Sequence, residues 1–408
     1  MFHECKSHVE RMVERIPDSN YQQLQHFISH SEWDAKAVMK EVAKNVNQSL
    51  ESLKGEKGLL LDESGNEKAG KHSVGVARQY IGNVGKVCNS QVGVYAGLSR
   101  ADKIGLVGAR LYLPKEWTSD KKRCTRAGVP RSEQKSQSKP ELALAIIEEL
   151  AGAVEYDWVG GDTIYGNSPD LRKALGRRGA AFVLDVGEEL KVCLAEPQPY
   201  VPLVVGKGRK RTRHLVDEKT VGLKDLIGQI APEQWERIQY RRGTKGRLVR
   251  EAVLKRIWVW KKGTAEVEAL ELLISRKLDG TEVKYSLCHE PRGKLSVDTA
   301  LYRQMQRYWI ERAFQEIKEQ IGLAQYQVRG WRAWEHHIAL TMMALHFILE
   351  TQVENAENLP LMSCGDVKLM LGNILKNKLD EPKILMQTIH QRHRVRQIDI
   401  LRRKQFLI

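Results

Sequence analysis

The 408-residue chain contains little cysteine, and its six cysteines are too scattered to build a covalent or metal framework. No two of them form a C-x-x-C pair, so neither a disulfide scaffold nor a zinc finger is indicated. No uncharged apolar run reaches the ~18 residues of a membrane span, and the N-terminus lacks the basic, apolar and small-residue order of a secretory signal. These absences predict a soluble, cytoplasmic, globular protein with reduced thiols.

Acidic residues are also too few to balance the basic ones: 51 Asp and Glu oppose 66 Lys and Arg, which gives a net charge of +15. The excess is concentrated, since residues 201–260 hold 15 basic and 6 acidic side chains. Such a concentration favours a polyanionic partner, although a solvated basic face is the alternative. The residues of this segment that we expect to contact phosphate are Lys207, Arg209, Lys210, Arg211, Arg213, Arg241, Arg242, Lys245 and Arg247.

The hydrophobic pattern changes several times along the chain and predicts an α/β fold of two or three domains. Apolar strands are expected at 59–61, ending at Asp62, and at 91–96, 106–113, 154–159 and 180–186, with helices at 140–153 and from 169. This order is typical of a mixed sheet flanked by helices. We expect a helical N-terminal region at 1–55, a core in two parts at 56–186 and 293–352, a basic β-rich insertion at 187–292, and a basic helical C-terminal region at 353–408.

Two aspartates, Asp62 and Asp162, come directly after apolar strands. In an α/β sheet, residues at that position face a crevice, so the two carboxylates are candidate ligands of a divalent cation. Taken singly, each is also typical of a turn or a helix cap.

A third carboxylate, Glu311, lies in a helix expected at 297–321. At ~100° per residue, Arg307, Glu311 and Lys318 form one polar stripe beside an apolar one. The alternative is an ordinary Arg307–Glu311 ion pair on a solvated helix. Three separated carboxylates suit two-metal phosphoryl transfer, and oxygen ligands favour Mg²⁺ or Mn²⁺ over zinc.

Several longer segments resemble one known family. These are KHSVGVARQY at 71–80, NSQV at 89–92, ARLYLP at 109–114, AGVP at 127–130, DTIYG at 162–166, and WIE and FQEIK at 309–318. They resemble the DDE transposases of bacterial insertion sequences, and most closely insertion-sequence family 701, a relative of the insertion-sequence-4 group. In that related group the third carboxylate belongs to a Y-x2-R-x3-E-x6-K signature, whose R, E and K spacing Arg307, Glu311 and Lys318 reproduce.

The resemblance implies an RNase H-like core and a transposase that cleaves DNA at the ends of its element and joins them to target DNA. It implies that Asp62, Asp162 and Glu311 bind two Mg²⁺ ions, with Mn²⁺ as a substitute, while Arg307 and Lys318 hold phosphates. The implied partners are the terminal inverted repeats, target DNA in the nucleoid, and a second copy of the chain in a synaptic dimer. Two departures are Gln304 at the signature's Tyr position and Asp-Glu-Ser-Gly at 62–65 in place of Asp-Asp-Thr-Gly.

Other residues have weaker assignments. Trp258 either stacks on an extruded base or, with Trp260, packs on one face of a strand. Arg329 and Arg332 either line a DNA channel or belong to a helix entering the core. A DNA-binding protein without catalysis, or an RNase H-like nuclease without strand transfer, are the alternative functions.

Overall fold

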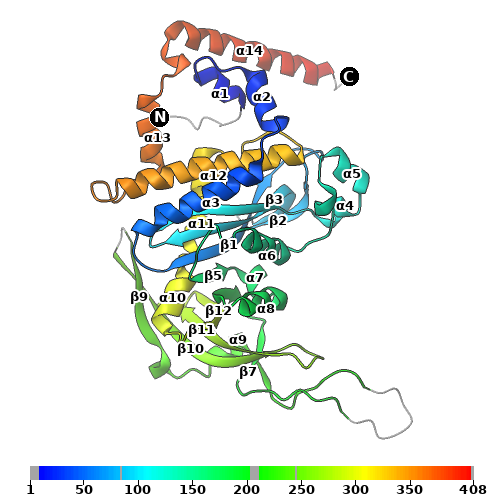
Figure 1. Ribbon diagram of the computed structural model, residues 1–408, viewed down its shortest axis with the longest axis vertical. Coiled ribbons are helices and arrows are strands. Elements are labelled where there is room, and N and C mark those ends of the chain that lie inside the picture. Colours follow the sequence, from blue (N-terminus) through cyan, green and yellow to red (C-terminus); the bar gives the residue numbers. More distant parts are fainter. Residues whose placement is uncertain (1–8, 83–84, 203–210, 244–245, 406–408) are drawn as a thin grey trace.

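A computed structural model describes residues 9–82, 85–202, 211–243 and 246–405 (Figure 1). Within these residues, twelve strands form one mixed sheet, with helices on its faces and at one end. Lys207, Arg209, Lys210 and Lys245 lie outside the described residues.

The centre of the sheet has the strand order β4-β3-β1-β5-β6. The first three strands are antiparallel neighbours, and β5 and β6 run parallel to β1. Apolar side chains such as Leu59, Leu60 and Leu61 bury this centre on both faces. Three antiparallel strands followed by two parallel ones in this order are the RNase H-like arrangement. The strands are β1 (Lys57–Glu67), β3 (Lys86–Arg100), β4 (Lys103–Leu111), β5 (Trp158–Gly161) and β6 (Ala181–Val186), with the short β2 (Ala77–Ile81) paired to β3.

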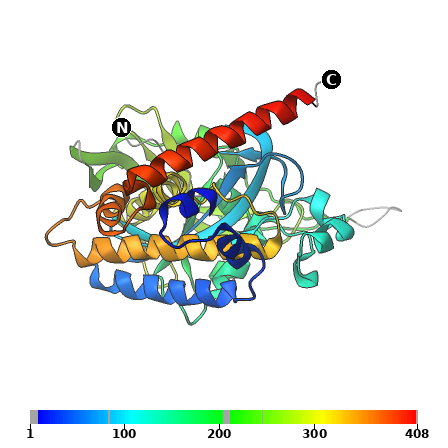
Figure 2. The ribbon, with the colours of Figure 1, turned by 90° about the horizontal axis from the view of Figure 1, so that it is seen from above.

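Helices supply the crossovers and cover the sheet. Between β4 and β5 the chain forms α6 (Lys139–Glu149), which begins at a capping box of Ser138 and Glu141. On the other face, α3 (Ala35–Ser49) and α12 (Trp331–Glu354) lie side by side (Figures 1 and 2). The shorter helices are α4 (Lys115–Thr118), α5 (Lys121–Arg126), α7 (Thr163–Gly166), α8 (Pro169–Arg177) and α9 (Leu223–Ile227).

The β-rich segment that follows β6 extends the same sheet, because its last strand pairs antiparallel with β6. The remaining neighbours along it are also antiparallel. Its strands are β7 (Lys191–Cys193), β8 (Thr220–Gly222), β9 (Glu236–Gly243), β10 (Gly246–Trp260), β11 (Val267–Arg276) and β12 (Val283–His289).

The terminal helices meet at one end of the molecule (Figure 1). They are α1 (Val9–Arg15), α2 (Tyr21–Ser29), α13 (Cys364–Ile374) and α14 (Pro382–Gln405). An ion pair of Arg392 with Glu14 ties α14 to α1. Among the described residues, no helix combines the length and the apolar character that crossing a bilayer demands.

Several expected elements have different bounds: the strand expected at 154–159 is β5 (Trp158–Gly161), and the helix expected at 140–153 ends at Glu149. The first strand does not end at Asp62, because β1 keeps pairing with β3 as far as Glu67. The expected single helix at 297–321 is divided at Arg307 into α10 (Val297–Gln306) and α11 (Tyr308–Glu316), followed by a π-helical turn at Ile317–Ile321. The division accompanies a change of partners, since α10 packs on β6, β9, β10 and β11 whereas α11 packs on β1 and β4.

A histidine is enclosed where α12 meets the segment after α11. The ring of His337 stacks on Tyr326 with centroids 4.5 Å apart, and its Nε2 lies 3.1 Å from the carbonyl oxygen of Leu323. Desolvation lowers the pKa of His337 to about 4. Since the unfolded chain takes up this proton near pH 6.5 and the folded chain does not, the stability from this group is present above pH ~6.5 and is lost as the pH falls towards 4.

We therefore expect wild-type protein to lose about 2 kcal/mol more unfolding free energy than His337→Gln when the pH falls from 7 to 4.5. Urea unfolding at both pH values measures the difference. His72→Gln, at an exposed position, serves as the control substitution. Equal losses in wild type and His337→Gln would contradict the expectation.

Candidate active site

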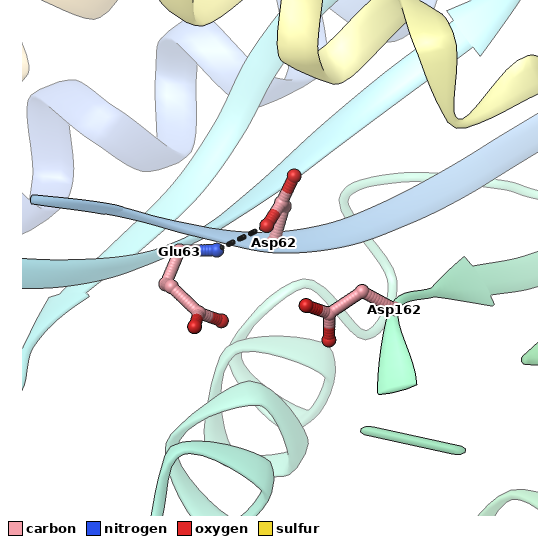
Figure 3. A group of neighbouring side chains, drawn as sticks. All are labelled: Asp62, Glu63 and Asp162. Carbon is pink, nitrogen blue, oxygen red and sulfur yellow. Dashed lines mark hydrogen bonds between the residues drawn. The ribbon is translucent and has the colours of Figure 1, made fainter. Parts of the chain in front are cut away.

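The two predicted aspartates are brought together by the pairing of β1 with β5. Leu61 of β1 pairs with Gly161 of the parallel strand β5. Asp62 and Asp162 each come one residue after this pair, so they lie beside one another. Asp162 also caps α7, accepting a hydrogen bond of 2.9 Å from the amide of Ile164. Figure 3 shows its carboxylate pointing towards β1.

A third carboxylate, that of Glu63, completes a compact acidic group. One oxygen from each of Asp62, Glu63 and Asp162 lies within 4.8 Å of the other two (Figure 3). Three carboxylates at this separation offer the hard oxygen ligands that Mg²⁺ and Mn²⁺ prefer.

The surroundings of Asp62 and Asp162 disfavour their ionised forms. Burial, together with the charges of Asp162 and Glu63, raises the pKa of Asp62 to about 8 against the opposing influence of Arg307. Burial and Glu63 likewise raise the pKa of Asp162 to about 6. A bound cation would relieve both effects, so the donor set fits a divalent metal.

Sequence reasoning passed over Glu63, although it stands beside Asp62. Its carboxylate pairs with Lys139 at the start of α6 (2.7 Å) and accepts a hydrogen bond from the Tyr165 hydroxyl (3.2 Å). The one available signal was the acidic residue at the second position of the Asp-Glu-Ser-Gly segment.

Glu311 lies outside this three-carboxylate group and is connected to it through Arg307. The Nη2 of Arg307 lies 2.7 Å from Glu311 Oε1, and its Nε lies 3.3 Å from Asp185 Oδ2. Asp62 and Asp162 also act on the Arg307 charge, and together with Asp185 and Glu311 they raise its pKa against the effect of burial. Arg307 thus forms ion pairs with Asp185 and Glu311, and the charges of Asp62 and Asp162 attract it as well.

Lys318 is the other cation of the predicted signature. It donates a hydrogen bond of 2.9 Å to the carbonyl oxygen of Gly65, three residues beyond Asp62 on β1. Burial lowers its pKa to about 8. The π-helical turn therefore brings this ammonium group to the strand that carries the first aspartate.

The predicted DNA contacts differ in their surroundings. Arg242 and Arg247 are exposed on β9 and β10, and Arg211 and Arg213 are exposed before β8. Arg241 stacks over Tyr308 and Trp309 at the start of α11, with its guanidinium carbon 4.1 and 5.0 Å from the two ring centroids.

The remaining predicted DNA contacts lie elsewhere. Trp258 is half-buried on β10, opposite Cys193 and Ala269 of the neighbouring strands. Arg329 is exposed, whereas Arg332 donates to the carbonyl oxygen of His30 at 3.1 Å and so contacts the N-terminal helices.

A glycine fixes the turn that follows Asp162. A Cβ added at Gly166 would lie 1.8 Å from the backbone oxygen of Asp185, so that α7 rests directly on β6. We expect Gly166→Ala to lower the unfolding free energy by about 3 kcal/mol, because neither backbone can move aside cheaply. Gly176→Ala in α8 is the control, since nothing lies within 4 Å of its added Cβ. It should raise stability by up to about 1 kcal/mol in the same urea titration, and equal effects of the two changes would contradict this packing.

The centre of the molecule is thus an RNase H-like sheet that brings carboxylates together at neighbouring strands. A sequence profile of the family described as DDE superfamily endonuclease matches residues 3–247, more than half of the chain. The chain belongs to this family.

Two further similarities are more limited. Over 156 residues the chain is 32% identical to a protein of Microchaete diplosiphon named "Probable transposase for insertion sequence element IS701". The matched part spans 36% of this chain and 36% of that relative. A solved structure of the piggyBac transposase synaptic complex with hairpin DNA resembles 75% of this chain and 49% of its own, with 12% identity and a TM-score of 0.37, a likeness too slight to carry an argument.

Proposed function

We propose that this protein is a DNA transposase, which cleaves DNA at the ends of an insertion sequence and joins them to target DNA. The observation that carries the proposal is the group of Asp62, Glu63 and Asp162 at the centre of an RNase H-like sheet in a chain of the DDE family. The partial similarity to a protein named as a transposase supports transposition rather than nucleolysis alone.

Asp62, Asp162 and Glu311 would hold two Mg²⁺ ions, or Mn²⁺ ions, with Glu63 beside them. When bound, such ions supply Lewis-acid stabilisation of the phosphate and a water of lowered pKa. The side chains of the protein would then position the phosphate. Arg307 and Lys318 bring positive charge near the carboxylates, and each would bind non-bridging phosphate oxygens.

The DNA would lie along the basic β-rich insertion, 187–292, and reach the carboxylates past the start of α11. Support comes from Arg241, which connects β9 with the first residues of α11, and from the exposed Arg242 and Arg247 next to it. The two ends of the element would be held by a homodimer acting on the nucleoid in the bacterial cytoplasm.

The test uses labelled duplex DNA that carries the inverted repeats flanking the gene, with Mg²⁺ or Mn²⁺. Cleavage at the repeat followed by joined products supports the transposase. Nicking without joined products would favour the nuclease, and binding without cleavage would favour a DNA-binding protein that has lost catalysis.

Salt dependence tests the DNA path separately. Replacing Arg241, Arg242 and Arg247 together by glutamine should reduce the slope of log affinity against log salt concentration by about 2 to 3, because each lost phosphate contact removes about 0.9. The control replaces the exposed Lys115, Lys122 and Arg126, which lie on α4 and α5 at the opposite side of the molecule (Figures 1 and 2). Equal slopes in both triple variants would exclude this path.

A further inference from the structure

We propose that Asp185 is a positioning residue, which holds the Arg307 guanidinium beside the metal-binding carboxylates. The inference rests on the proposed function, because it concerns how Arg307 is aimed at a phosphate. Asp185 lies on β6, and its side chain is 14% exposed.

A continuous chain of hydrogen bonds fixes Asp185 itself. Ser286 lies opposite Asp185 in the antiparallel pairing of β12 with β6, and its hydroxyl donates to Asp185 Oδ1 at 2.5 Å. The amide of Gln304 donates to the Ser286 hydroxyl oxygen at 2.7 Å, and Gln304 Oε1 accepts from Ser275 on β11 at 2.6 Å. Three strands and α10 thus determine where the Asp185 carboxylate lies.

The other oxygen of Asp185 faces Arg307. Its Oδ2 lies 3.3 Å from Arg307 Nε, which has no aligned hydrogen-bond acceptor among the described residues. The attraction is therefore that of an ion pair and leaves the Nε–H free to donate. Since Nη2 is engaged with Glu311, the guanidinium is held at two points while retaining donors for a phosphate oxygen.

This network gives Gln304 a role that differs from a phosphate contact. Gln304 occupies the position of the tyrosine in the related signature, but the residue is only 3% exposed. Its amide oxygen and its amide nitrogen are each hydrogen-bonded to a serine. Gln304 on α10 is thus connected to Arg307 through Ser286 of β12 and Asp185 of β6.

The decisive variant is Asp185→Asn. It keeps the side-chain volume and an oxygen that can accept from Ser286, and it removes the charge that faces Arg307. We expect kcat for cleavage of the inverted-repeat duplex to fall by about 10-fold to 100-fold, as when the partner that orients an active-site group is removed. In a cycle with Arg307→Ala, the double variant should cleave no more slowly than Arg307→Ala alone, because Asp185 acts only through Arg307.

A matched control is available at another arginine of the same segment, Arg303. Glu290 pairs with the buried Arg303 of α10 at 2.9 Å, as Asp185 pairs with Arg307, whereas the ion pairs of Arg307 within the described part of the chain are with Asp185 and Glu311. Glu290→Gln should leave kcat within about twofold even if it lowers the melting temperature, and its effect should multiply with that of Arg307→Ala. Multiplying effects in the Asp185 cycle would overturn the inference.

DNA affinity provides a readout that does not depend on cleavage. Asp185→Asn, Arg307→Ala and the double variant should all reduce the salt slope for duplex binding by the same amount, about 0.9. If wild type binds but never cleaves, the proposed function fails while this comparison still decides the positioning role. Absence of DNA binding by wild type would overturn both. Should Asp185→Asn not fold, Ser286→Ala removes the bond that orients Asp185, and an unchanged kcat and salt slope in that variant would overturn the inference.

Discussion

Asp62→Asn and Asp162→Asn are each expected to reduce DNA cleavage by at least about 1000-fold while the protein stays folded. Asparagine keeps the size of the side chain and one oxygen, but it lacks the negative charge that binds a divalent cation. The loss should appear in kcat with Mg²⁺ and with Mn²⁺ alike. Single-turnover cleavage of the labelled inverted-repeat duplex measures it.

Stability separates this loss from unfolding. Asp62 is buried among other carboxylates, and burial is the main cause of its raised pKa. Removing a buried charge of this kind should leave the melting temperature unchanged or raise it. Asp170, exposed in the first turn of α8, is the matched control, and Asp170→Asn should cleave as wild type does. Activity within tenfold of wild type in Asp62→Asn would refute the assignment of this group as the metal site.

Much of the sheet could be predicted from the sequence, because each apolar strand is followed by a clear change of pattern. The run at 59–61 lies within β1, and the run at 180–186 begins one residue before β6 and ends with it. The end of β1 could not be predicted, because polar residues after Asp62 continue the strand only through their pairing with β3. In the same way, the division at Arg307 follows from what α10 and α11 pack against, which local periodicity does not contain.

The site was predictable in part for the same reason. That Asp62 and Asp162 lie close together could be predicted, because each comes directly after an apolar run of the sequence. The surroundings of Glu63 depend on Lys139 and Tyr165, which come from α6 and α7 and reach it only in the folded sheet. Asp185 sits inside an apolar strand, so nothing in its local sequence indicates that it faces Arg307.

A comparison of Glu311→Gln with Glu63→Gln tests which of the two residues is the third metal-binding carboxylate. We expect Glu311→Gln to lose at least about 1000-fold in cleavage and Glu63→Gln to lose about 10-fold. Both oxygens of Glu63 are already engaged, one by Lys139 and one by Tyr165, so neither is free to bind a metal ion without giving up a partner. Glu311 has a side chain 51% exposed and pairs with Arg307, a cation that a DNA phosphate also attracts.

Glu316 gives a matched control on the same helix. It pairs with Arg312 at 2.7 Å and four residues' spacing, as Glu311 pairs with Arg307 at 2.7 Å. Glu316→Gln therefore removes the same kind of ion pair, and we expect cleavage within about twofold of wild type. If Glu63→Gln were inactive and Glu311→Gln active, the metal site would consist of Asp62, Glu63 and Asp162, and Glu311 would serve only to hold Arg307. If Glu316→Gln alone were inactive, the third metal ligand would be Glu316, about one and a half turns further along the helix. The proposal that Arg307 binds a DNA phosphate would then fail.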